Sequence, residues 1–153
     1  MKRIWMFLLL GILLAGCGTG NKVSSNGSDG EITTGGKGIV AGEMGASLIE
    51  KSPLIFQYEV KNQTEEEVTL EFTSSQRFDY SVKTQDGKEI FLFSSVASFL
   101  QALGEETVKP GEALTYEMDL NELDLKKGDY VLSAWMTPKE GQKYKVDTEF
   151  TVK

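Results

Sequence analysis

Apolar and polar residues alternate with a period of two along most of the chain from about Ile39 to the C-terminus. In one such run, Phe56 and Tyr58 alternate with Gln57 and Glu59. This alternation is typical of antiparallel strands that bury one face. It predicts strands over residues 54–60, 68–72, 78–82, 114–120, 130–136 and 144–152.

Turn-forming residues separate several of these runs. Asp86-Gly87 fits a tight hairpin turn, Lys109-Pro110-Gly111 offers Pro and then Gly at turn positions, and Lys127-Gly128-Asp129 precedes the fifth run. Short strands with turn residues between them indicate a sandwich or barrel. We therefore predict an all-β fold, an immunoglobulin-like antiparallel β-sandwich of seven or eight strands.

One stretch departs from the β pattern. Val96, Phe99, Leu100 and Leu103 follow the i, i+3, i+4, i+7 spacing of one helix face. Ser94-Ser95 before them is able to cap a helix, and Gly104 after them is able to end it. The spacing predicts one short helix of two turns that crosses between the sheets. Such a helix more often plugs the core than binds a partner.

Residues 1–16 have the organisation of a bacterial lipoprotein signal peptide. Basic Lys2 and Arg3 precede an apolar stretch at residues 4–14, which is shorter than the roughly 20 residues that span a bilayer. The stretch ends in Leu14-Ala15-Gly16-Cys17, which resembles a lipobox. The resemblance implies a diacylglyceryl group on Cys17. The alternative is an ordinary signal peptide followed by a chance or structural cysteine.

The domain organisation follows from these boundaries. Residues 17–38 are rich in Gly and poor in strongly apolar residues, which predicts a flexible linker behind the lipid anchor. Residues 39–153 are then the folded domain. Two acyl chains anchor a protein stably, so we expect an exported protein on the outer face of the cytoplasmic membrane.

Composition disfavours most enzyme classes. The chain has no His and one Cys, which removes the usual general base, the Ser/His and Cys/His nucleophile pairs and multi-Cys metal sites. A formal charge of −7 argues against nucleic-acid binding. The densest acidic cluster lacks the spacing of a calcium loop; it comprises Asp119, Glu122, Asp124 and Asp129 with Asn121. We predict no catalytic activity, no metal and no cofactor.

Several strings resemble one known family, in the order in which they occur there. They are FQYEVKNQT at residues 56–64, VTLEFTSSQRFD at 68–79, QALGEETVKPGE at 101–112 and KGDY at 127–130. This part of the chain, about residues 54–136, is similar to BsuPI, the intracellular proteinase inhibitor of Bacillus. The resemblance implies an immunoglobulin-like sandwich and a subtilisin-like serine protease as partner, although the present chain carries an export signal. It implies no particular inhibitory residue.

Three residues are candidate partner contacts. Gln76 and Arg77 lie between two predicted strands, where loops on rigid scaffolds often bind. Arg77 could pair with a partner's carboxylate, or with Asp79 or a glutamate of its own domain. Trp135 lies opposite the apolar face of residues 130–136, so it is exposed if that face is the core. If both faces are covered, Trp135 belongs to the core.

Two functional hypotheses remain. The chain is a tethered module that binds a protein, possibly inhibiting a subtilisin-like serine protease by occluding its cleft. Alternatively, it is a non-inhibitory structural or accessory lipoprotein that binds another envelope protein, because fold alone does not determine function.

Overall fold

The computed structural model describes residues 34–36 and 41–153. This part of the chain is almost entirely β-structure. Its elements, in chain order, are β1 Thr34–Gly36, β2 Met44–Ser52, β3 Ile55–Asn62, β4 Val68–Phe72, β5 Phe78–Thr84, β6 Glu89–Leu92, the 3₁₀ turn η1 Phe93–Ser95, β7 Gly104–Val108, β8 Ala113–Asp119, the 3₁₀ turn η2 Asn121–Leu123, β9 Gly128–Met136 and β10 Lys143–Val152.

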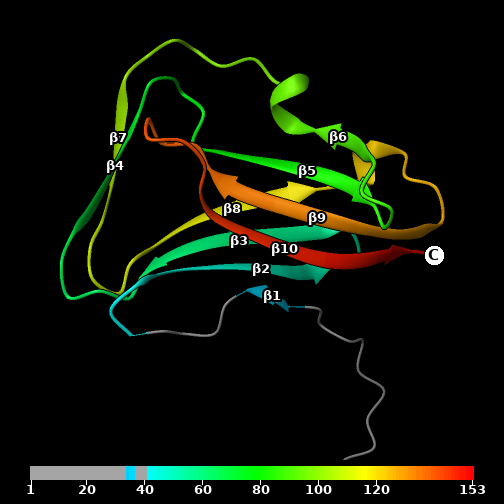
Figure 1. The fold of residues 1–153 in the computed structure, drawn as a ribbon, viewed down its shortest axis with the longest axis horizontal. Coiled ribbons are helices and arrows are strands. Elements are labelled where there is room, and N and C mark those ends of the chain that lie inside the picture. Colours follow the sequence, from blue (N-terminus) through cyan, green and yellow to red (C-terminus); the bar gives the residue numbers. More distant parts are fainter. Residues whose placement is uncertain (1–33, 37–40) are drawn as a thin grey trace, which may run out of the picture. The chain divides into compact units, whose positions relative to one another are not determined.

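Two four-stranded antiparallel sheets form the sandwich, in the orders β1-β2-β3-β8 and β10-β9-β5-β6. Figure 1 shows these sheets as two layers, with β4 and β7 forming a separate ribbon at one end. The predicted all-β, immunoglobulin-like antiparallel sandwich is confirmed. All six predicted strands are present. The structure adds β1, β2, β6 and β7, whose sequences do not alternate cleanly, so the described residues form ten strands where seven or eight were predicted.

The core lies between the two sheets and comes from the apolar positions of the alternating runs. Phe56, Tyr58 and Val60 of β3 are fully buried. They belong to the same cluster as Leu132 and Met136 of β9. Burying one face of each strand removes apolar surface from water, which is the main driving force for this arrangement.

β1 lies within the stretch that the sequence predicted to be linker. Thr34, Gly35 and Gly36 pair with Ile49, Leu48 and Ser47 of β2. Backbone groups make this pairing, so it needs no apolar side chains. Sheet pairing therefore begins upstream of residue 39. The predicted signal peptide, Cys17 and most of the predicted linker lie outside the described residues.

The predicted helix at residues 94–103 is wrong. Only the 3₁₀ turn η1 forms, and residues 97–103 have no regular secondary structure. The backbone N–H of Leu100 donates to Ser75 Oγ at 2.9 Å instead of to a carbonyl one helical turn back. A two-turn helix is marginal by itself, so contacts with another loop decide the conformation.

Among the residues that the structure describes, no helical segment has the length and apolar character needed to cross a membrane.

Candidate protein-binding surface

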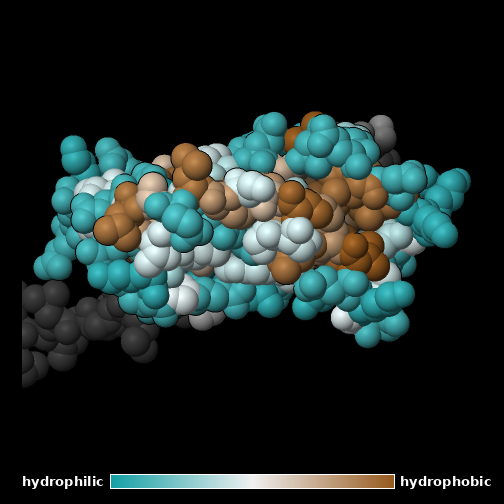
Figure 2. Space-filling model, turned by 90° about the horizontal axis from the view of Figure 1, so that it is seen from above, coloured by the Kyte–Doolittle hydropathy of each residue, from teal (hydrophilic) through white to brown (hydrophobic). Residues whose placement is uncertain are grey.

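The stretch that failed to form a helix is an exposed apolar segment, hereafter the apolar segment, residues 96–104. Val96, Leu100 and Leu103 leave 68%, 74% and 87% of their surface accessible. The sequence correctly singled out these residues but placed them in the core. In Figure 1 the segment runs from η1 to β7 along the top of the molecule, and the face seen from that side carries hydrophobic patches between hydrophilic residues (Figure 2).

The apolar segment also lacks charge. No Asp, Glu, Lys or Arg occurs between Glu89 and Glu105, in a chain of which 25% is charged. An exposed run of large apolar side chains without charge is unusual on a monomeric protein and commonly marks an interaction site.

The N-terminal end of the apolar segment is fixed by η1. The Ser94 backbone N–H donates to Asp79 Oδ1 at 3.0 Å, and the Phe93 ring stacks on Tyr80 with centroids 5.1 Å apart. Phe99 packs edge-on against Phe93 at 5.8 Å. Asp79 is buried in β5, so this end of the segment is attached to a rigid strand.

The middle of the apolar segment is held by Ser75, in the loop before β5. The Ser75 backbone N–H donates to the Leu100 carbonyl at 2.8 Å. In return, the Leu100 N–H donates to Ser75 Oγ. These two hydrogen bonds fix the Leu100 backbone while its side chain remains in solvent.

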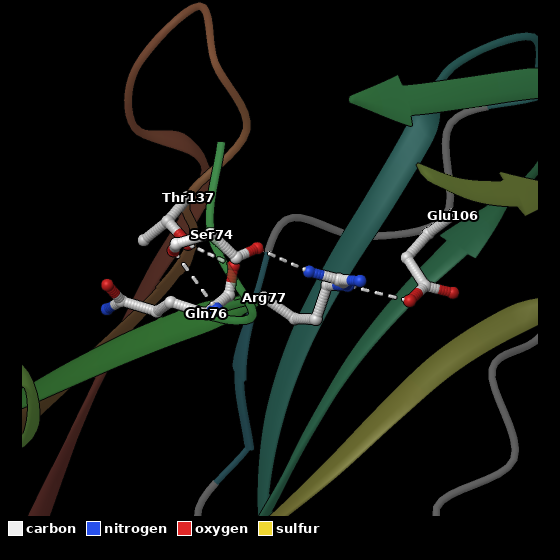
Figure 3. A network of polar contacts seen from close by, with 5 residues as sticks. All are labelled: Ser74, Gln76, Arg77, Glu106 and Thr137. Atoms are coloured by element: carbon white, nitrogen blue, oxygen red, sulfur yellow. Dashed lines mark hydrogen bonds and ion pairs between the residues drawn. The ribbon is translucent and has the colours of Figure 1, made fainter. Parts of the chain in front are cut away.

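Arg77 lies beneath the C-terminal end of the apolar segment. Its Nε donates to Glu106 Oε1 at 2.7 Å and its Nη1 donates to the Ser74 carbonyl at 2.8 Å (Figure 3). Its Cζ lies 4.6 Å from the centre of the Phe72 ring. A Cβ added to Gly104 would collide with the guanidinium. Gly104 thus permits the backbone to approach Arg77 closely.

From the sequence, Arg77 could pair with a carboxylate of a partner protein or with one of its own domain. In the structure it pairs within its own domain. Its partner is Glu106, while Asp79 instead accepts from the backbone of Ser94 and of Tyr80. Arg77 is therefore a residue that supports the apolar segment from below. The local sequence carries no specific signal for Glu106 as the partner of Arg77, because the two residues are 29 positions apart.

Gln76 belongs to the same polar network. Its carbonyl accepts a hydrogen bond from Thr137 Oγ1 at 3.3 Å, and its own N–H donates to Ser74 Oγ at 3.2 Å (Figure 3). The Arg77 carbonyl accepts from the Thr137 N–H at 3.0 Å. The loop of Gln76 and Arg77 is thereby joined to the chain just after β9.

Trp135 is half-buried and lies on the face of β9 opposite Ala134 and Met136, which are in the core. It pairs with Asp79 across β5 and β9. Because Asp79 holds Ser94, the structure brings Trp135 to the end of the sheet from which the apolar segment starts. The Trp135 side chain is therefore neither exposed nor part of the core, which were the two alternatives that the sequence left open.

The Tyr116 phenol, near Glu106, stays protonated. Burial, reinforced by the nearby Glu106 carboxylate, raises the pKa of the Tyr116 phenol to about 12. The phenol is therefore neutral at physiological pH. In the described part of the chain, no three Asp, Glu, His or Cys side chains are grouped so that they could hold a metal ion. The apolar segment itself carries no charged side chain.

Comparison with known proteins identifies the family. The sequence model of BsuPI, described as intracellular proteinase inhibitor, matches residues 45–141. No curated protein matches the chain. The matched range covers well over half of the 153 residues and contains the apolar segment, Gln76, Arg77 and Trp135. This agrees with the resemblance of the four sequence strings, and the chain belongs to the BsuPI family of proteinase inhibitors.

Proposed function

We propose that this protein is a membrane-tethered, extracytoplasmic module that binds a subtilisin-like serine protease and inhibits it by occluding its cleft. Membership of a proteinase inhibitor family supports a protease as partner. A protein inhibitor needs only to block access to the protease's active site, so it binds the protease without catalysing a reaction.

The observation that carries the proposal is the exposed apolar segment on a rigid scaffold. Val96, Leu100 and Leu103 have accessible side chains, while Ser75 and Asp79 hold the backbone around them by hydrogen bonds. A backbone that is already fixed loses little further conformational entropy on binding, which favours affinity.

Titration tests the inhibitor function. The full chain, purified in detergent, is added in increasing amounts to active-site-titrated subtilisin, and hydrolysis of a chromogenic peptide is followed. We expect activity to fall linearly to a stoichiometric end point, because occlusion removes one enzyme molecule for each inhibitor bound. Detergent alone is the control. An undiminished rate with the protein in large molar excess, across a panel of secreted and intracellular subtilisins, would contradict the proposal.

The second candidate function is a non-inhibitory structural or accessory role, in which the same surface binds another envelope protein. The export signal favours this alternative, since the family is described as intracellular. A pull-down from the host's cell wall and culture medium separates the two, because capture of a non-protease partner together with a failed titration supports the accessory role.

The tether is a separate part of the proposal and rests on the lipobox-like Leu14-Ala15-Gly16-Cys17. Replacing Cys17 with Ser in the native host removes the only thiol able to form the thioether. We expect the variant to keep its signal sequence and to lack acyl chains. Mass spectrometry of the wild-type N-terminus provides the comparison, with a diacylated Cys17 expected. An unmodified Cys17 or an intact Met1 in the wild type would rule out the anchor.

A further inference from the structure

We propose that the apolar segment, residues 96–104, lies along the substrate-binding cleft of the protease as a substrate-like strand, with Leu100 and Leu103 as its anchoring side chains. This inference rests on the proposed inhibitor function and specifies the part of the chain that does the blocking. The partner that receives this segment in its cleft is a subtilisin-like serine protease.

The backbone of the apolar segment has free hydrogen-bonding groups. Within the described part of the chain, the N–H groups of Phe99, Gln101 and Leu103 donate to no other backbone group. A protease cleft can hold a peptide by adding it as a strand, with backbone hydrogen bonds supplying affinity and alternating pockets supplying specificity. The free N–H groups are available for such hydrogen bonds and the exposed Leu side chains for the pockets, while the Ala102 N–H remains bonded to the Leu100 carbonyl at 3.0 Å.

The protease cleft is taken as the partner of the apolar segment because the chain belongs to a proteinase inhibitor family. Protease–inhibitor interfaces bury about 800 Å² on each partner. The contact would therefore extend beyond the exposed apolar side chains to the exposed polar residues Ser75, Gln101 and Glu105. Polar residues of this kind commonly form the rim around the apolar centre of an interface.

Three attachments hold the apolar segment in one conformation. Asp79 binds the backbone before it, the Ser75 pair binds its middle, and Gly104 at its end pairs with Phe72 of β4. A substrate must distort on the way to hydrolysis, so a segment fixed at both ends and in the middle should be cleaved slowly. Cleavage would add water across one peptide bond, producing a new carboxylate and a new amine.

Leu100→Ser and Leu103→Ser in the full chain test the anchors. We expect the inhibition constant against subtilisin to rise by about thirtyfold or more for at least one of them, as for interface hot spots. Ile90→Ser is the matched control, because Ile90 is an exposed apolar residue on β6 outside the segment. The control should inhibit like the wild type. Circular dichroism checks that all three variants fold.

Competition and cleavage mapping identify the site on the protease. A peptide aldehyde bound in the subtilisin active site should exclude the inhibitor, and long incubation should yield a cut within residues 96–104, detected as a mass gain of one water. If the wild type inhibits but binds together with the aldehyde, or if both Leu variants inhibit unchanged, the cleft assignment is wrong while the inhibitor function stands. If the wild type does not inhibit, the proposed function itself fails.

Ser75→Ala tests the positioning role of the loop. It removes the hydrogen bond from the Leu100 N–H to Ser75 Oγ and keeps the one from the Ser75 N–H to the Leu100 carbonyl. We expect faster cleavage of the apolar segment with folding unchanged, and restoration of slow cleavage by Ser75→Thr, which returns the hydroxyl. An unchanged cleavage rate in Ser75→Ala would contradict the positioning role.

Discussion

Replacing Phe72 with alanine is expected to lower the free energy of unfolding by about 3–5 kcal/mol. Phe72 ends β4 with 2% of its surface exposed, and it pairs with Gly104, the first residue of β7. Its ring also lies beneath the Arg77 guanidinium. Truncation would leave a cavity in the core and remove the surface on which Arg77 rests. Urea unfolding followed by fluorescence measures the loss.

The neighbouring Glu71→Ala is the control for this experiment. The Glu71 side chain is half-exposed and forms an ion pair with Lys139. Surface pairs of this kind contribute about 0–1 kcal/mol, so the loss should be small. Similar losses from Phe72→Ala and Glu71→Ala would show that the assigned burial of β4 is wrong.

Replacing Asn62 with alanine is expected to destabilise the domain by about 3 kcal/mol or more, because the change leaves buried polar groups without partners. Asn62 is fully buried at the end of β3. Its Nδ2 donates to the carbonyls of Glu66 at 2.7 Å and Val108 at 2.8 Å, and its Oδ1 accepts from the Thr64 N–H and hydroxyl. Urea unfolding again measures the effect.

Two further variants sharpen the test at Asn62. Asn62→Asp keeps the acceptor toward Thr64 but removes both donors and turns a carboxylate toward the two carbonyls, so it should destabilise at least as much as alanine. Asn121→Ala is the control, since Asn121 is exposed and bonds mainly to Asp119 beside it. It should lose about 1 kcal/mol or less. An Asn62→Ala protein as stable as Asn121→Ala would contradict the role of the buried amide.

Phe72 and Asn62 bear on function because both contact β7, the strand that follows the apolar segment. Phe72 pairs with the first residue of β7, and Asn62 binds the carbonyl of its last residue, Val108. The local sequence predicts Phe72 as a core position from alternation. It carries no comparable signal for Asn62, because the two carbonyls that the amide binds are brought together by the fold.

For the candidate partner contacts Trp135 and Arg77, too, the sequence predicted one part and the fold decided the rest. Alternation correctly placed Trp135 on the opposite face from Met136, since side chains of a strand point alternately to its two sides. Its half-buried state depends on neighbours from other strands and could not be predicted. For Arg77, charge indicated an ion pair, yet the choice of Glu106 over Asp79 depends on β7 lying beside the loop.

The sequence by itself determined the antiparallel sandwich and the family. Strand alternation, turn residues and the recurring strings are local properties, so they can be recognised without knowing which residues meet in the fold. Only the tertiary structure decided the conformation of residues 96–103. Their apolar spacing suits a helix, but an isolated two-turn helix is marginal, and the Leu100 backbone pairs with Ser75, 25 residues earlier in the chain. That long-range pairing, with Arg77 beneath Gly104, keeps the apolar segment on the surface and out of the core.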